Sequence, residues 1–472
     1  MTDSVESTGL GRLWGGRFAQ PSASALSALS VSTHFDVALL PYDVLQSRAH
    51  VRELRRCGFL DDASAAALDS ALAQIAQEFA MGTWTPSPED EDIHSAVERT
   101  LIERCGADIG GRIRTGRSRN DQVTTDFRLY LRDAAAEIAH ATLELAEALV
   151  SKAEAHGADI CAGFTHLQHA QPVTFGHELA KHVWALLRDL DRLASWRQRA
   201  NVSPMGAGAL AGSSLGLDSQ RVAADLGFAT AADNSIDAVS DRDFVAEFCF
   251  VTAMLGVHLS RIGEEVCIWA TPEFGWIRLH DSWSTGSSLM PQKRNPDIAE
   301  LARGKSGRLI GSLVTVMTML KGLAFGYNRD QQEDKEAVFD SVATLLLVLP
   351  AVTGLITTMT VDRQRLSDSV RTGHSTATDI AEWLVRAGLT FREAHDIAGE
   401  CVKWAENKGC DLTELSAADL TEVHPMLADA ADALSPEASL AARSSVSGPA
   451  PESVMAQLRR ARQALKQEVA RW

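Results

Sequence analysis

This chain of 472 residues has only 33 glycines and 14 prolines, far below the combined share in a low-complexity chain. That scarcity excludes a collagen-like repeat and a low-complexity disordered chain, and 45% hydrophobic residues are ample for a buried core. The seven cysteines are odd in number and contain no Cys-x-x-Cys pair, so neither a zinc site nor a disulfide framework is indicated. We expect reduced cysteines, several of them buried.

An excess of basic charge is also lacking, since 45 Lys+Arg stand against 62 Asp+Glu and the net charge is -17. Nucleic acid is therefore not expected as the main partner, because counterion release needs a basic face. The N-terminus carries Asp3 and Glu6 without an apolar core segment, unlike a signal peptide. We also expect no apolar run of the roughly 18 charge-free residues that a membrane span needs. The sequence predicts a soluble cytoplasmic protein without a membrane partner.

Glycine and proline are both absent for 40 residues between Gly116 and Gly157. A continuous helix of that length would be about 60 Å long, well beyond the average globular helix. Its apolar residues recur in steps of three and four, which predicts one apolar stripe along the helix. The stripe consists of Val123, Phe127, Leu131, Ala134, Ile138, Ala141, Leu145 and Leu149. A long amphipathic helix of this kind is typical of a bundle.

The same pattern recurs in four later segments, at about 173–200, 240–271, 296–323 and 330–361. Ser240 and Asp243 resemble a capping box at the start of the second of these, and Pro350 should kink or break the last. No convincing run of alternating strand residues lies between the segments. We therefore predict an all-α fold whose central domain is a long-helix bundle, and self-association to cover the outer apolar stripes.

Shorter helical patterns, broken by turns rich in proline, occupy the two ends of the chain. They predict three domains: an N-terminal helical domain at 1–116, the central bundle at 117–364 and a C-terminal helical domain at 365–472.

Polar residues that fit no helical stripe gather in four segments. The loop at 110–122 has four arginines and runs into a helix N-terminus, which favours an anion site over a solvated basic turn. The loop at 163–172 surrounds His166 with hydroxyl and amide groups. This pattern makes His166 a candidate for proton transfer, with a histidine that has no catalytic role as the equal alternative.

The segment at 285–300 begins with small residues, as a closing lid does, and then offers Lys293 and Asn295 to a carboxylate. A flexible linker would not require the sequence PQKRNP, which follows at 291–296. The segment at 327–336 is more simply interpreted, from composition alone, as a charged helical turn.

These segments together resemble the argininosuccinate lyase family of the fumarase/aspartase superfamily, over nearly the whole chain. The strings that carry the resemblance are LWGGRF at 13–18, GRSRNDQ at 116–122, THLQ at 165–168, NSIDAVSDRDF at 234–244, MPQK at 290–293, ATD at 377–379 and FREAH at 391–395. Three positions depart from the family pattern: Arg294 stands for the usual Lys, Gln331 for a common Leu and Ala207 for a frequent Ser. Arg294 is also seen in adenylosuccinate lyases.

The resemblance implies a homotetramer with active sites assembled from three subunits. The implied reaction is the reversible elimination of arginine from argininosuccinate, leaving fumarate, with neither a metal nor an organic cofactor. By analogy Ser287 is the base, and His166 is the second proton-transfer group, oriented by Glu300. Lys293 and Asn295 would stabilise the doubly charged carboxylate of the intermediate. Because a serine hydroxyl is a poor base unless its alkoxide is stabilised, its role depends on the resemblance.

Substrate contacts follow from the resemblance position by position. Those expected on the arginine side are Ser32, Asp36, Tyr327, Gln332 and Lys335, and those expected near the succinyl carboxylates are His94, Arg119, Asn120 and Thr165. Two other hypotheses stay open: adenylosuccinate lyase or another fumarate-releasing lyase of the superfamily, and a non-enzymatic, crystallin-like structural protein. The presence of Ser287, His166, Lys293 and Glu300 argues against a structural protein.

Overall fold

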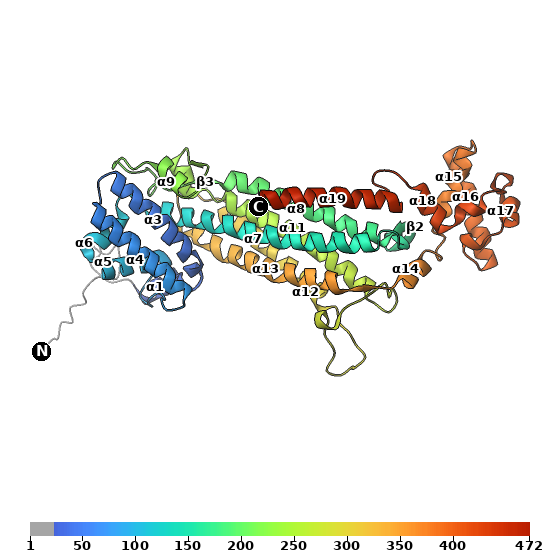
Figure 1. The fold of residues 1–472 in the computed structure, drawn as a ribbon, viewed down its shortest axis with the longest axis horizontal. Helices are drawn as coiled ribbons and strands as arrows, with labels where there is room; N and C mark the ends of the chain where they lie inside the picture. The colour runs from blue at the N-terminus through green and yellow to red at the C-terminus, as the bar shows by residue number, and fades with distance from the viewer. Residues whose placement is uncertain (1–22) are drawn as a thin grey trace. The chain divides into compact units, whose positions relative to one another are not determined.

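The computed structural model describes residues 23–472, and α-helices dominate it (Figure 1). The chain divides into two compact units. Unit 1 comprises 1–135, 195–249 and 312–340, and unit 2 comprises 136–194, 250–311 and 341–472. The LWGGRF string at 13–18 lies outside the described residues. The three-domain division made from the sequence stays a prediction.

The five long helices are present where the sequence predicts them. They are α7 (Arg119–Ala155), α8 (Phe175–Ala200), α11 (Asp243–Trp269), α12 (Asp297–Leu320) and α13 (Asp334–Thr358). The apolar stripe of α7 is buried, with Leu131, Ile138 and Leu145 all at 0% exposure. Helix α13 continues through Pro350 and is not broken there. The prediction of a fold dominated by long helices is confirmed.

Two helices are long and apolar enough to cross a membrane by length and composition: Asp243–Trp269 and Arg329–Thr358. Residues 341–361 carry no charged side chain. The expectation that no apolar run reaches 18 charge-free residues was therefore wrong. About half of each apolar window, 56% and 50%, is buried inside the chain, as in the core helices of soluble proteins. The two helices are weak evidence for a membrane span.

Short strands interrupt the helices, which the sequence did not predict. Strand β1 (Ile160–Thr165) pairs antiparallel with β2 (Gln168–Thr174), β3 (Val202–Ser203) pairs parallel with β4 (Thr230–Ala231), and β5 (Ile277–Arg278) pairs antiparallel with β6 (Thr360–Val361). The β1–β2 hairpin replaces the loop expected at 163–172. Its register shifts between Ala162 and Phe164, where a Cβ on Gly163 would lie 2.7 Å from the carbonyl oxygen of Gln171. This bulge hides the alternating pattern of a regular strand.

Unit 1 adds short helices around the start of α7. They are α1 (Ser24–Ser30), α2 (Thr33–Asp36), α3 (Leu40–Arg56), α4 (Asp62–Ala80), α5 (Ile93–Cys105), α6 (Ala107–Gly110), α9 (Ser219–Asp225) and α10 (Ser235–Ser240). Short 3-10 turns lie at Val37–Leu39, Gly111–Arg114 and Arg329–Glu333. One apolar cluster of this unit joins Ala49 of α3, Leu129 of α7 and Val222 of α9. The packing fixes the start of α7 against α3.

Unit 2 contains the C-terminal helices. They are α14 (Arg363–Ser369), α15 (Ala377–Arg386), α16 (Phe391–Lys408), α17 (Ala417–Val423), α18 (Pro436–Ala442) and α19 (Pro451–Arg471), with 3-10 turns at Asp281–Trp283, Leu412–Glu414, Pro425–Leu427 and Ala431–Leu434. Helix α19 runs beside α8 in Figure 1. Its Arg462 binds Glu154 of α7 at 2.7 Å, and its Arg471 lies 3.3 Å from Asp191 of α8. The chain thus returns along the long helices after its C-terminal cluster.

None of the seven cysteines, which all lie in the described residues, is in a disulfide, and Cys161, Cys249 and Cys401 are buried. Both agree with the sequence analysis.

Candidate active site

His94 lies in the first turn of α5, where the sequence provides a strong helix start. Asp92 caps the helix by accepting the N–H of Ser95 at 2.7 Å, and the hydroxyl of Ser95 completes a capping box. His94 is only 3% exposed. Its Nδ1 lies 3.0 Å from Oδ2 of Asp43 and 3.4 Å from Oδ2 of Asp126. The cap therefore places the imidazole among buried carboxyl groups.

Ser32 and Asp36 form a small buried unit beside this helix. The Ser32 hydroxyl donates to Oδ2 of Asp36 at 2.6 Å, and the backbone N–H of Ile93 donates to Oδ1 at 3.2 Å. Burial raises the pKa of Asp36, although His94 and the Ser32 hydroxyl oppose the shift. Two residues predicted for the arginine side thus contact the helix that carries His94.

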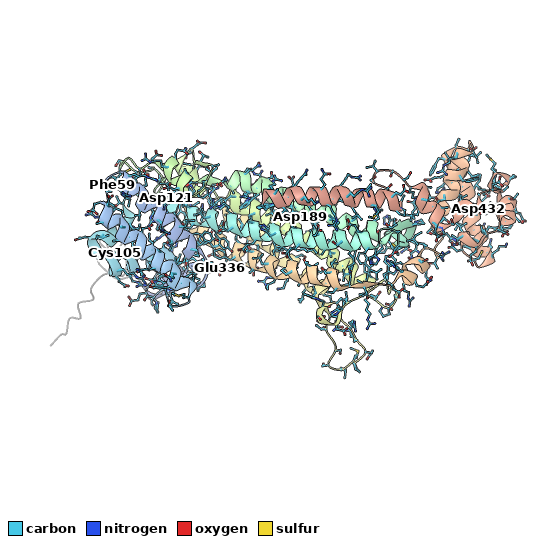
Figure 2. The ribbon with its side chains drawn as sticks, viewed as in Figure 1. Phe59, Cys105, Asp121, Asp189, Glu336 and Asp432 are labelled. Atoms are coloured by element: carbon cyan, nitrogen blue, oxygen red, sulfur yellow. The ribbon has the colours of Figure 1, made fainter. Side chains whose placement is uncertain are left out.

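Asp121 organises the start of α7 (Figure 2). One of its oxygens accepts the N–H of Ser118 at 2.9 Å, and the other accepts those of Gly206 and Gly208 at 3.1 and 2.9 Å. Burial raises the pKa of Asp121 to about 6, against the pull of these donors. Arg119, in the same turn, lies 3.0 Å from Asp92. The turn is thereby tied to the start of α5.

The arginines of this loop already have partners within the chain. Arg112 donates to the carbonyl of Phe59, Arg114 pairs with Glu98 at 3.0 Å, and Arg117 donates to Gln46 and Ser47 at 2.9 and 2.8 Å. Arg119, whose side chain is 25% exposed, pairs with Asp92. Asn120 donates to the carbonyl of Ala209 at 3.0 Å. The loop is neither a solvated turn nor a set of unpaired cations.

The segment at 327–336 is only in part the charged surface turn that composition suggests. Gln331, Asp334 and Lys335 are buried, at 1%, 0% and 6% exposure. Lys335 donates to Asp334 at 2.7 Å, and Gln332 donates to the carbonyl of Ser30 at 3.4 Å. Tyr327 lies in the same region, and burial raises the pKa of its phenol. Within this segment Asp334 and Lys335 form a buried pair, whereas Asp330, Glu333 and Glu336 are exposed.

His166 stands at the tip of the β1–β2 hairpin. Thr165 pairs with Gln168, so His166 and Leu167 form the two-residue turn, with φ angles of 57° and 59°. Two residues in the left-handed region make a type I′ geometry, which favours Asn-Gly and strains larger side chains. Both side chains are exposed. The hairpin thus displays an exposed imidazole at a strained position.

The lid segment at 285–300 begins with a projecting loop (Figure 1), and the two ends of that loop are joined by hydrogen bonds. Asn295 and Thr285 exchange backbone hydrogen bonds at 2.8 and 3.3 Å. Within the loop, Oγ of Ser287 accepts the N–H groups of Leu289 at 3.3 Å and Met290 at 3.1 Å. An oxygen that faces two backbone donors is better able to hold a negative charge.

Lys293 is exposed in the lid, and Glu300 is half-exposed in the first turn of α12, where Arg303 lies 3.9 Å away. Among the described residues, no hydrogen bond or ion pair connects Glu300 with His166. The predicted site residues fall into two sets. Unit 1 holds Ser32, Asp36, His94, Arg119, Asn120, Tyr327, Gln332 and Lys335, and unit 2 holds Thr165, His166, Ser287, Lys293, Asn295 and Glu300.

Several buried polar residues near the unit 1 set were missed by the sequence analysis. Helix α3 buries Asp43, Gln46, Ser47 and His50 at 0–1% exposure. Their spacing of three and four residues puts them on one face of the helix, and this periodic polar face is the sequence signal that could have found them. Arg117 lies in the arginine-rich loop that the sequence analysis did identify, whereas Asp126 carries no comparable sequence signal.

Asp43, His94 and Asp126 also offer metal-ligand atoms within 4.8 Å of one another. The chemistry of the surroundings does not fit a cation, however. Nδ1 of His94 already faces Asp43, and despite burial the His94 hydrogen bond and then the positive charge of Arg117 lower the pKa of that carboxyl. Arg117 thus supplies positive charge that a metal would otherwise bring.

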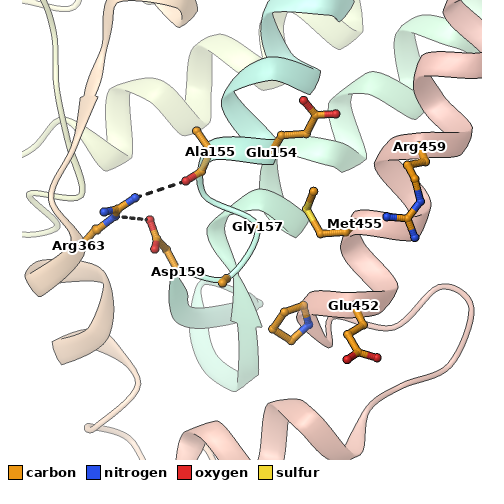
Figure 3. Close-up of a pocket in the computed structure, with 10 residues that line it drawn as sticks. Glu154, Ala155, Gly157, Asp159, Arg363, Glu452, Met455 and Arg459 are labelled. Atoms are coloured by element: carbon orange, nitrogen blue, oxygen red, sulfur yellow. Dashed lines mark hydrogen bonds and ion pairs between the residues drawn. The ribbon is translucent and has the colours of Figure 1, made fainter.

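A cavity of about 650 Å³ lies elsewhere in unit 2, lined by Glu154, Gly157, Asp159, Arg363, Met455 and neighbouring residues (Figure 3). Arg363 donates to Asp159 at 2.9 Å and to the carbonyl of Ala155 at 3.4 Å. None of the predicted site residues lines this cavity, so its size alone does not make it the active site.

Comparison with known proteins resolves which branch of the superfamily this is. Residues 16–311 match the family described as Lyase, and residues 374–441 match the one described as Argininosuccinate lyase C-terminal. The chain is 55% identical to an argininosuccinate lyase of Frankia casuarinae, over 97% of this chain and 99% of that protein. It is also 55% identical to one of Mycolicibacterium vanbaalenii, over 96% of both. The chain belongs to the argininosuccinate lyase family.

Solved structures show the same fold. An EDDS lyase variant with bound fumarate is 30% identical with a TM-score of 0.84, and the match covers 96% of this chain and 92% of that one. A class II fumarase from Schistosoma mansoni, 16% identical, has a TM-score of 0.75 over 87% of this chain and 94% of that one, and shares the fold alone.

The three residues that depart from the argininosuccinate lyase pattern each have contacts within the described chain. Arg294 donates to the carbonyl of Leu279 at 2.7 Å and pairs with Asp281 at 2.7 Å. Gln331 donates to the carbonyl of Ser240 at 2.8 Å, and Ala207 packs in a small apolar cluster. Arg294 thus braces the base of the lid.

Proposed function

We propose that this chain catalyses the reversible elimination of L-argininosuccinate to L-arginine and fumarate, a step of arginine biosynthesis. The observation that carries the proposal is the 55% identity to argininosuccinate lyases over 96–97% of the chain. The match at 374–441 to the C-terminal part of that family supports the same branch over adenylosuccinate lyase.

The lid geometry supports Ser287 as the base. The base takes a proton from the carbon next to a succinyl carboxylate, and that carboxylate then carries a double negative charge. Two backbone N–H groups on the Ser287 oxygen favour its alkoxide, which answers the objection that a serine hydroxyl is a weak base. Lys293 and Asn295 stabilise the new charge. The C–N bond then breaks, and His166 provides a proton to the leaving nitrogen.

The unit 1 set is proposed to bind the substrate. Ser32, Asp36, Tyr327, Gln332 and Lys335 take the arginine end, and His94, Arg119 and Asn120, with Thr165 of unit 2, take the succinyl carboxylates. Asp36 is suited to a cationic amino group because its carboxyl is buried and already oriented by Ser32. Neither a metal nor an organic cofactor takes part in these steps.

We further propose a homotetramer whose active sites combine residues of three subunits. Support comes from the outer face of α12, where Ile310, Val314 and Met317 are 44%, 58% and 56% exposed at spacings of four and three residues. Gly304 and Gly307 have open space where a Cβ would stand, which allows a second helix to approach closely. The contact between Glu300 and His166 would then form between copies. The proposed compartment is the cytoplasm.

The deciding experiment follows fumarate absorbance with argininosuccinate and, separately, with adenylosuccinate. Release from argininosuccinate alone supports the proposal. Release from adenylosuccinate alone would assign the chain to the neighbouring branch, and release from neither would favour a non-enzymatic, crystallin-like protein. Because the reaction is reversible, arginine and fumarate together should also yield argininosuccinate.

A further inference from the structure

The imidazole of His94 faces two carboxyl groups that are equally buried but differently surrounded. Asp43 and Asp126 are both at 0% exposure, and both point an oxygen at Nδ1 of His94. Asp43 also accepts the hydroxyl of Ser47 at 3.0 Å and the amide of Gln122 at 2.9 Å. Asp126 accepts no hydrogen bond at either oxygen within the described part of the chain. Two neighbouring carboxyls that differ so much should not carry the same charge.

Two arginines near the pair are connected by hydrogen bonds to Asp43. Arg117 donates to the Ser47 hydroxyl at 2.8 Å, and that hydroxyl donates on to Asp43. Arg119 donates to Gln122 at 2.9 Å, whose amide in turn donates to Asp43. Both hydrogen-bond chains therefore end on the same oxygen of Asp43, and neither includes Asp126.

The charges facing each carboxyl agree with this inequality. The His94 and Gln122 hydrogen bonds and the charge of Arg117 lower the pKa of Asp43 to about 2 despite its burial. Burial and the neighbouring Asp43 charge raise the pKa of Asp126 well above its usual range, although Arg117 and Arg119 oppose the shift. Two ionised carboxylates this close would repel each other in a buried site, and protonation of one removes the repulsion.

We propose that Asp43 is the positioning residue of His94, that it keeps the ring hydrogen on Nδ1, and that Asp126 stands beside it as a neutral carboxylic acid. An ionised Asp43 can only accept a hydrogen bond, so Nδ1 must donate. Nε2 is left as the ring atom that faces a ligand, and among the described residues it has no hydrogen-bond partner. This rests on the proposed function, which makes His94 a contact of the succinyl carboxylates. Because a carboxylate only accepts hydrogen bonds, Nε2 must also carry a hydrogen when substrate is bound, and an ionised Asp43 stabilises the ring with both hydrogens in place. Fixing one nitrogen to orient the other is a common use of a carboxylate beside histidine.

The two carboxyls allow a matched pair of variants. Asp43→Asn removes the negative charge that stabilises the ring with hydrogens on both nitrogens, and we expect kcat/KM for argininosuccinate to fall at least about tenfold. Asp126→Asn replaces one neutral polar group by another at the same depth, and we expect kcat/KM to stay within about threefold. An equal loss in both variants would overturn the proposal.

A purely structural role of Asp43 is separated by a double-mutant cycle with His94→Asn. If Asp43 acts through the ring, Asp43→Asn should cause no further loss of kcat/KM once His94 is Asn. A loss of the same size in both backgrounds would overturn the positioning role. A divalent metal bound stoichiometrically by the wild type and lost from Asp126→Asn would also overturn the proposal, because a metal ligand must be ionised.

A neutron crystal structure of the deuterated full chain reads the hydrogens without any assay. We expect deuterium on Nδ1 of His94 and on one oxygen of Asp126, with none on Asp43. Deuterium on Asp43, or none on Asp126, would overturn the assignment. Because this readout does not use turnover, failure of the proposed lyase activity and failure of the Asp43 assignment can be told apart.

Discussion

Nε of Arg242 lies 2.6 Å from Oδ2 of Asp334, and both side chains are buried, at 1% and 0% exposure. The second oxygen of the same carboxylate accepts the ammonium of Lys335 at 2.7 Å. One buried carboxylate thus pairs with two cations, Arg242 from the link between α10 and α11 and Lys335 from α13. Lys335, which we assign to the arginine side of the substrate, is held in place by this pairing.

Replacing Asp334 by Asn should lower the free energy of unfolding by about 3–5 kcal/mol, because two buried cations lose their partner. The measurement is denaturant unfolding followed by circular dichroism. Glu91→Gln serves as the control, since Glu91 pairs with Arg329 at a similar distance of 2.9 Å but at 32% and 58% exposure. That variant should lose less than about 1 kcal/mol. Comparable losses in the two variants would contradict the account.

Ser287→Ala should leave the fold and the oligomer unchanged and reduce kcat by about 10²–10⁴, the usual contribution of a general base. Ser288→Ala is the matched control, because Ser288 is adjacent in the lid but is not assigned a role in proton transfer. It should stay within a few-fold of the wild type. Fumarate absorbance measures both, and unchanged turnover in Ser287→Ala would place the base elsewhere.

Leu167→Gly should stabilise the β1–β2 hairpin by about 0.5–1 kcal/mol. The φ of 59° costs a leucine about 1–2 kcal/mol, and the greater freedom of glycine in the unfolded chain offsets part of the gain. The side chain is 75% exposed, so little packing is lost. Slower amide hydrogen exchange at Phe164 and His169 is the expected readout. Faster exchange would mean that the leucine is held there by contacts.

Periodicity predicted the long helices because their apolar stripes are sequence signals, as in α7. It failed where a local detail of the backbone decides the structure. The hairpin that displays His166 depends on a bulge at Gly163, which interrupts strand alternation. The predicted capping box at Ser240 was wrong for the same kind of reason: Ser240 ends α10, and Asp241 accepts the N–H of Asp243 at 2.6 Å instead.

The candidate site could be predicted where its residues lie in polar loops, as Ser287 does. The residues around them could not be predicted. Asp126 lies in α7 and Asp43 in α3, and the sequence near Asp126 does not indicate that the two carboxyls meet in the fold. The role of the segment around Lys335 came from the resemblance, while composition alone suggested a surface turn. Burial of charge is a property of tertiary packing, and a single sequence does not record which charges meet.

Val314→Lys on the exposed face of α12 should shift the oligomer to smaller species, because a buried ammonium at a helix contact lacks a partner. Light scattering coupled to size exclusion gives the mass. Glu400→Lys, which adds a positive charge at an exposed position of α16, is the control and should leave the mass unchanged. A wild-type mass that Val314→Lys does not alter would remove this face from the proposed tetramer.

His50→Gln should weaken the acid sensitivity of the fold. Burial and the nearby charge of Arg117 lower the pKa of His50 from 6.5 to about 3, and its Nε2 lies 3.0 Å from the carbonyl oxygen of Thr115. Between those two pKa values the unfolded chain binds a proton that the folded chain does not, so stability is lost as the pH falls below 6.5.

From pH 7.5 to 5.5 this one group should contribute a loss of about 1.4 kcal/mol in the free energy of unfolding. The glutamine variant, which can still donate to the carbonyl of Thr115, should lack that part of the loss. His140→Gln, at an exposed position of α7, should keep the wild-type pH dependence. Denaturant unfolding at the two pH values compares all three proteins. If His50→Gln follows the wild type across this window, then His50 must be able to bind a proton within the fold.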